Sequence, residues 1–265
     1  MHVLRSLSML HPTWVFAGLS AAAILGLDFS WLLHQEGAVW IATKHSIAIT
    51  GDPHLHRIYV RNLRVCNRGG LSVTDPSRTL VDCALRYPFR AVLPMFDSAA
   101  RRGLVTEESL LAVCDSMRID VSPILKLLKY TDGASENGGE SLCRAIMIEN
   151  GFALPELQCV FVDPTNPQEK YRADFTWKLG GGRVIVLEFD GNEKYVNPEM
   201  TKGRNIEQVV DDERKRESVL RRAGVSELIR TNYREISDET RFVLKLAAAG
   251  VPRIEAGDCK ERVVR

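Results

Sequence analysis

Three carboxylates in the stretch from Tyr171 to Tyr195 have the residue types and spacing to bind a divalent cation. Asp174 lies on one apolar segment, and Glu188 and Asp190 end the next one. The glycines at 180–182 tolerate positive φ, so we expect the two segments to be strands joined by a hairpin. Because side chains alternate along a strand, Glu188 and Asp190 should emerge on the same face.

These acids follow an apolar run, Val184 to Leu187, that is typical of a strand covered on both faces. Carboxylates at such a position need a partner, because burial of an unpaired charge is costly. In one interpretation, arginines or backbone amides satisfy Asp174 and Glu188. In the other, the two residues are ligands of Mg²⁺ or Mn²⁺, since magnesium is usually held by one or two carboxylates with water and substrate phosphate. Their spacing is compatible with both.

The order of charged groups around this stretch carries more information than any one residue. Glu140 begins a predicted helix, Asp174 and Glu188-Phe189-Asp190-Gly191 follow, and a helix with several arginines comes next. This order resembles the PD-(D/E)XK restriction-endonuclease-like superfamily, and more narrowly its Vsr-like branch. The resemblance implies a magnesium-dependent nuclease that hydrolyses DNA. The segments that carry it are Glu140–Arg144, Arg172–Phe175, Glu188–Gly191 and Glu213–Glu217, with Leu220, Gly224 and Arg230.

The same resemblance implies roles for individual side chains. Asp174 and Glu188 would hold the metal, and Asp190 or Glu140 would support it directly or through water. The superfamily expects a lysine at the second position after the glutamate, where this chain has Asp190. Lys194 is therefore either a displaced catalytic lysine near the attacking water or an ordinary surface residue. A carboxylate in the first helical turn is also favourable without any metal, which leaves a capping role open for Glu140.

The predicted helix over 204–223 carries only a small excess of basic residues. Alternating charge of this kind is typical of a solvated helix face. The resemblance implies that Arg214, Arg216 and Arg230 contact the DNA backbone beside the acids. Arg216 has an alternative role as a structural tie to Glu140 or Glu188.

Composition sets the broad class of the protein. A chain of 265 residues predicts two domains, which we place at 1–130 and 131–265 because the polar, glycine-bearing segment 129–139 separates them. The formal net charge of +1 offers no whole-chain argument for nucleic acid.

The cysteines form no CxxC pair, which predicts reduced thiols in a cytoplasmic protein. Asp28 and Ser30 interrupt the apolar segment 14–33, so we expect a buried helix over 20–27 and no membrane partner.

The first domain contains a second recognisable segment, VTDPSRTLVD at 73–82, in which Asp75 is the expected helix N-cap. With AGLSAAAILGL at 17–27, this segment resembles AbiEi-like type IV antitoxins. That family usually carries a winged helix in front of its sheet, and the residues before this sheet leave little room for one. The resemblance therefore implies a second function: an antitoxin-like or regulatory protein that binds nucleic acid, a toxin or another protein through an inactive nuclease fold. The purely structural alternative is a capped helix whose Leu80, Val81 and Leu85 pack inward.

Together the patterns predict an α/β chain, α+β overall. A small α+β domain precedes a restriction-endonuclease-like mixed sheet flanked by helices. Strands are expected over 39–43, 56–60, 63–65 and 71–74 in the first domain and over 152–162 in the second. A turn-rich loop is expected over 163–170, and a closing helix over 236–249.

Overall fold

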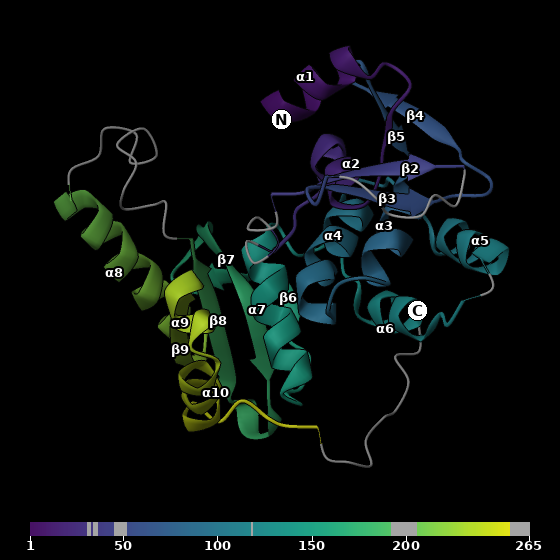
Figure 1. The fold of residues 1–265 in the computed structure, drawn as a ribbon. Helices are drawn as coiled ribbons and strands as arrows, with labels where there is room; N and C mark the ends of the chain where they lie inside the picture. The colour runs from purple at the N-terminus through teal and green to yellow at the C-terminus, as the bar shows by residue number, and fades with distance from the viewer. Residues whose placement is uncertain (31–32, 34–36, 45–51, 118, 192–205, 255–265) are drawn as a thin grey trace. The chain divides into compact units, whose positions relative to one another are not determined.

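The computed structural model describes residues 1–265 apart from 31–32, 34–36, 45–51, 118, 192–205 and 255–265 (Figure 1). The described chain has an α+β fold, as expected, and divides into two compact units, Met1–Leu142 and Cys143–Arg265. The boundary predicted at residue 130 lies ahead of helix α7 (Gly138–Glu149), whereas the division between the units falls inside that helix.

A mixed sheet with the strand order β3-β2-β1-β5-β4 forms the centre of the first unit. Strands β1 and β5 are parallel, as are β2 and β3, whereas β1 and β2, and β4 and β5, run antiparallel. The expected strand over 39–43 is confirmed, but the one expected over 63–65 begins only at its last residue. The strands are β1 (Val15–Phe16), β2 (Val39–Thr43), β3 (Leu55–Tyr59), β4 (Val65–Arg68) and β5 (Leu71–Thr74).

Helices complete the first unit, and the apolar one after β1 is almost entirely buried. This helix, α2, ends at Gly26, which adopts the left-handed conformation at φ 69°. No helix within the described ranges is long and apolar enough to cross a membrane. The helices are α1 (His2–Leu10), α2 (Gly18–Leu25), α3 (Pro76–Ala84), α4 (Phe89–Arg101), α5 (Glu107–Met117) and α6 (Ser122–Tyr130).

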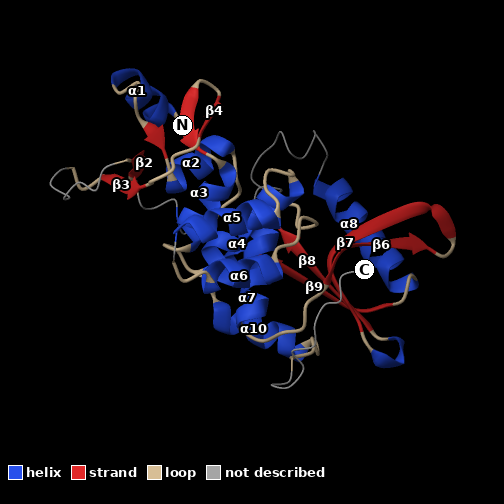
Figure 2. Ribbon diagram, turned by 90° about the vertical axis from the view of Figure 1, so that its right-hand side faces the viewer, coloured by secondary structure: helices blue, strands red, loops and turns tan. Residues whose placement is uncertain are grey.

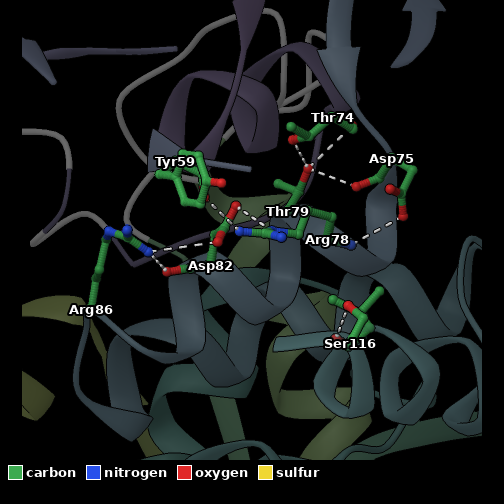
Figure 3. A network of polar contacts seen from close by, with 9 residues as sticks. Tyr59, Thr74, Asp75, Arg78, Thr79, Asp82, Arg86 and Ser116 are labelled. Carbon is green, nitrogen blue, oxygen red and sulfur yellow. Dashed lines mark hydrogen bonds and ion pairs between the residues drawn. The ribbon is translucent and has the colours of Figure 1, made fainter. Parts of the chain in front are cut away.

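The segment 73–82 forms the end of β5 and most of α3, and Figure 3 shows its polar contacts. The Asp75 carboxylate accepts a hydrogen bond from the Arg78 backbone N–H at 3.1 Å, which confirms the expected N-cap. Asp82 is fully buried and pairs with Arg78 at 3.1 Å and with Arg86 at 3.7 Å. Burial raises the pKa of Asp82 although both arginines oppose the shift. Asp75 and Asp82 are thus engaged within the unit, although the Asp82 Oδ1 has no hydrogen-bond partner.

The apolar side chains of α3 agree largely with the structural alternative for this segment. Leu80 and Val81 are completely buried, whereas Leu85 is partly exposed just beyond the helix end. The segment that resembles the antitoxins therefore packs as an ordinary amphipathic helix of the core.

The second unit is built on a sheet with the strand order β6-β7-β8-β9. The first three strands are antiparallel neighbours, and β9 runs parallel to β8 after the chain has crossed over through α8. Helix α8 lies against β6, β7 and β9 (Figure 2). Its Leu220 packs with Ala173, Val186 and Val225. The elements after α7 are β6 (Glu156–Asp163), β7 (Asn166–Lys178), η2 (Gly180–Gly182), β8 (Val184–Asp190), α8 (Ile206–Arg222), β9 (Val225–Asn232), α9 (Tyr233–Ser237) and α10 (Glu239–Ala248).

One expectation for this unit is wrong, and another is confirmed only in part. The loop predicted over 163–170 is mostly strand, because β7 begins at Asn166 after a tight turn. The Asp163 carboxylate fixes that turn by accepting hydrogen bonds from the Thr165 N–H at 2.9 Å and hydroxyl at 2.7 Å. The single closing helix divides at Asp238, whose side chain caps α10 by accepting from the Arg241 N–H at 3.1 Å.

The cysteines follow the prediction within the described part of the chain. Cys83, Cys114 and Cys143 are buried free thiols, and Cys66 and Cys159 are partly exposed free thiols. The remaining one, Cys259, lies outside the described residues.

The N-cap of α3 can be tested by the substitution Asp75→Ala. We expect the free energy of unfolding to fall by about 1 kcal/mol, because an N–H at the helix start loses its acceptor. Urea unfolding followed by circular dichroism measures this loss. Asp115→Ala, at an exposed position inside α5, is the control and should change stability by less than about 0.5 kcal/mol. Equal effects of the two substitutions would contradict the capping role.

Candidate functional site

The hairpin of β7 and β8 brings the predicted acids together where the pairing of these two strands ends. Phe175 lies opposite Leu187 in the antiparallel ladder, so the next residues outward are Asp174 and Glu188. Gly181 and Gly182 adopt φ values of 71° and 76° in the connection, which explains the glycine run. The expected hairpin is therefore confirmed.

Asp174 and Asp190 are both partly exposed. The Asp174 Oδ2 accepts a hydrogen bond of 2.8 Å from the Phe189 backbone N–H. Asp190 ends β8, opposite Asn232 on β9. The Asp174 carboxylate is thus fastened to the strand that carries the other two acids.

Glu188 is the most buried of the three acids, with a relative exposure of 7%. Its Oε2 forms an ion pair with the Arg216 guanidinium, whereas its Oε1 is buried without a hydrogen-bond partner. Burial raises the pKa of Glu188 from 4.5 to about 7. The negative charges of Asp174 and Asp190 add to the rise, and Arg216 opposes it. A further positive charge therefore stabilises the ionised form of this buried carboxylate more than it would stabilise an exposed one.

Helix α8 contributes charged side chains above this part of the sheet. Arg230 lies beside Glu188 in the parallel ladder and forms an ion pair of 2.6 Å with Glu213 of α8. Arg216 stands one helical turn after Glu213, so both reach the same region of the sheet. Arg214 differs from them, since its side chain is 79% exposed and lies 3.8 Å from Asp211. Arg216 and Arg230 therefore lie beside the acid cluster, whereas Arg214 extends into solvent.

Two predicted site residues remain, Glu140 and Lys194. Glu140 belongs to the first compact unit, where it is 4% exposed. Its carboxylate accepts hydrogen bonds from the Glu136 N–H at 2.8 Å and from the Asn137 side chain at 2.5 Å, at the start of α7. These contacts match the capping alternative for Glu140. Lys194 lies outside the described residues.

The sequence gives no role to two acids of the second unit that form ion pairs with arginines. Glu213 lies in a segment that carries the nuclease resemblance, which assigns it no role of its own, and it pairs with Arg230. Asp163 was assigned to a loop, but it is buried and pairs with Arg222 of α8. Arg222 holds the pKa of the Asp163 carboxyl well below its usual range. Helix α8 thus carries two arginines that each bind a buried carboxylate.

The contacts expected without a metal are both present: Asp174 binds a backbone amide and Glu188 binds an arginine. Among the described residues, no group of three or more His, Cys, Asp or Glu side chains is arranged to hold a metal ion. A site here would therefore use two carboxylates, which is the usual number of protein ligands for magnesium. The unpaired, buried Oε1 of Glu188 is the feature that fits such an ion.

Comparison with known proteins adds little about this site. No family model matches the chain, and no solved structure matches it. Similarity was found to the uncharacterized proteins MT2308 and Rv2248 of Mycobacterium tuberculosis strains CDC 1551 and H37Rv. Each is 28% identical over 144 residues, which cover 54% of this chain and 50% of the relative. The chain thus spans about half the length of the curated relatives it matches.

The pKa of Glu188 can be tested through the pH dependence of stability. Because the folded-state pKa is raised, the stability contributed by this group is present below its unfolded pKa and is lost as the pH rises through about 7. The free energy of unfolding of the wild type, measured in urea without divalent cations, should fall relative to Glu188→Gln by up to about 3 kcal/mol between about pH 4.5 and pH 8.

The control for this measurement is Asp163→Asn, which also alters a buried carboxylate paired with an arginine. The Asp163 pKa is lowered, so its effect on the pH profile belongs to the region below about pH 4. Asp163→Asn should therefore leave the slope near neutral pH unchanged. Parallel profiles for the wild type and Glu188→Gln would show that Glu188 titrates normally.

Proposed function

We propose that the second unit binds Mg²⁺ or Mn²⁺ through Asp174 and Glu188 and hydrolyses phosphodiester bonds of DNA. The observation that carries the proposal is the state of Glu188. It is buried and has a raised pKa, and one of its oxygens lacks a partner although Arg216 binds the other. A site of this kind stabilises an added cation more than a solvated carboxylate does.

Each nearby side chain has a role in this proposal. When bound, a divalent cation lowers the pKa of an attacking water and offsets the charge that develops on the phosphate. Asp174 and Glu188 hold the ion, and Asp190 assists at the end of β8. Arg230 offers a positive charge to the DNA backbone, and the exposed Arg214 offers another further along α8. Lys194 keeps its predicted role near the water.

The architecture of the second unit supports the same proposal. Helix α7 precedes an antiparallel run of β6, β7 and β8, and α8 then leads to β9, which is parallel to β8. This is a mixed sheet flanked by helices, as the nuclease resemblance implies. Asp174 lies within β7, and Glu188 and Asp190 lie in the last three residues of β8. Fold alone does not define an activity, so the proposal depends on the site.

One observation favours a second function. The Arg216 guanidinium already gives Glu188 a positive partner, and Asp190 stands where the nuclease pattern has a lysine. An arginine can replace a metal ion as the counter-charge of a buried acid. In that case the protein is an antitoxin-like or regulatory protein that binds nucleic acid or a partner protein without cleaving it.

Cleavage of supercoiled, linear and single-stranded DNA with Mg²⁺ or Mn²⁺ tests the first function. We expect the wild type to cut, and Asp174→Asn to reduce the rate by about 100-fold or more because an amide is a much weaker cation ligand than a carboxylate. Asp211→Asn removes an acid that is 76% exposed on α8 and should leave the rate within about twofold.

Two other outcomes would reject the nuclease. Absence of cleavage by the wild type with either metal would do so, as would equal cleavage by the wild type and Asp174→Asn. If DNA binding persists in Asp174→Ala and does not depend on Mg²⁺, the non-catalytic function is supported instead.

A further inference from the structure

Arg216 stands where it can control the geometry of the two proposed ligands. We infer that it is a positioning residue, whose guanidinium ties Glu188 to the backbone of β7 and so presents Oε1 to a cation shared with Asp174. This role differs from the phosphate contact that the resemblance implies for Arg216. The inference rests on the proposed function.

Arg216 contacts both β7 and β8. The β7–β8 ladder ends at Phe175 and Leu187, so no pair of this ladder joins Asp174 to Glu188. The Arg216 Nη2 binds Glu188 on β8 and also donates a hydrogen bond of 2.8 Å to the Arg172 carbonyl on β7. One guanidinium therefore bridges the two strands just beyond their last pair.

Arg216 contacts only one of the two oxygens of the Glu188 carboxylate. It occupies Oε2 and leaves Oε1 buried without a partner. Both residues bear a desolvation cost, because the Arg216 Nε, like the Glu188 Oε1, is buried without a hydrogen bond. Arginine–carboxylate pairs are frequently bidentate, with the planar fork on both oxygens, whereas Arg216 binds one oxygen of Glu188.

Arg222 shows that two-oxygen binding is available on the same helix. Its Nε donates to Asp163 Oδ1 at 3.3 Å, and its Nη2 binds Oδ2. Thr165 adds hydrogen bonds from its N–H and its hydroxyl to Oδ1. Asp163 thus has both oxygens engaged, whereas Glu188 keeps one available for a further ligand.

This arrangement matches the general behaviour of metal ligands. A carboxylate that binds a metal is commonly oriented by a second group that holds its other oxygen, and loss of that group typically weakens metal binding by about 10- to 100-fold. Arg216 is 26% exposed in its side chain, so it is packed firmly against the sheet. Arg214, on the same helix, is 79% exposed and provides a matched control.

The test is a calorimetric titration of Mn²⁺ into the metal-free full chain. We compare the wild type with Arg216→Gln, Arg216→Lys and Arg214→Gln, and check by circular dichroism that each is folded. Arg216→Gln should weaken Mn²⁺ binding by about 10- to 100-fold. Arg216→Lys should recover part of the loss, because a single ammonium keeps the charge but not the planar fork. Arg214→Gln should leave the affinity for Mn²⁺ within about twofold.

A second measurement separates positioning from DNA contact. Binding to a DNA duplex without divalent cations should be unchanged in Arg216→Gln and weaker in Arg214→Gln, whose exposed charge is free to approach phosphates. Unchanged or tighter Mn²⁺ binding by Arg216→Gln would overturn the positioning role, and so would an equal loss in Arg214→Gln. If Arg216→Gln does not fold, Arg216→Lys decides the matter, since affinity equal to the wild type would overturn the inference.

The same titration distinguishes this inference from the function on which it rests. If the wild type shows no saturable Mn²⁺ binding, the metal site and the positioning role both fail. If the wild type binds Mn²⁺ and the Arg216 variants bind it equally well, only the positioning role fails.

Discussion

The second unit depends on how the charge of one buried carboxylate is compensated. Glu188 ends an apolar strand, where removal from water raises its pKa to about 7 even with Arg216 beside it. Asp174 and Asp190 add negative charge to the same region and increase the cost of ionising Glu188. A protein that keeps an acid in such a place either leaves it protonated or gives it a second cation. The proposed nuclease site is the second solution.

Helix α8 carries both a residue of the hydrophobic core and the arginine that compensates the charge of Glu188. Its Leu220 packs on the sheet with Val186, while Arg216, one turn earlier, reaches Glu188. The position of the arginine is therefore fixed by apolar packing of the helix that carries it. A change in that packing would move the guanidinium relative to the acids, which links the stability of the core to the geometry of the site.

Most of the fold could be predicted from the sequence because its elements carry strong local signals. The glycine run predicted the β7–β8 hairpin, and Asp75 with Pro76 predicted the start of α3. The residues after Asp163 were assigned to a loop because their side chains are polar and include prolines, yet pairing with β6 makes them strand. The pairing of β6 with β7, which the local sequence does not reveal, therefore determines the structure of this segment. The same is true of the site: spacing indicated Glu188 and offered Arg216 as its partner, but burial and the unpaired oxygen arise only in the folded chain.

In the proposed site, Asp174 and Glu188 share one divalent cation. The most direct measurement is an anomalous difference map from crystals soaked in Mn²⁺. We expect a peak within coordination distance of a carboxylate oxygen of Asp174 and of Glu188 Oε1, with Arg216 still on Oε2. A map without a peak between these residues, in crystals where Arg216 and a protonated Glu188 fill the space, would contradict the proposed site.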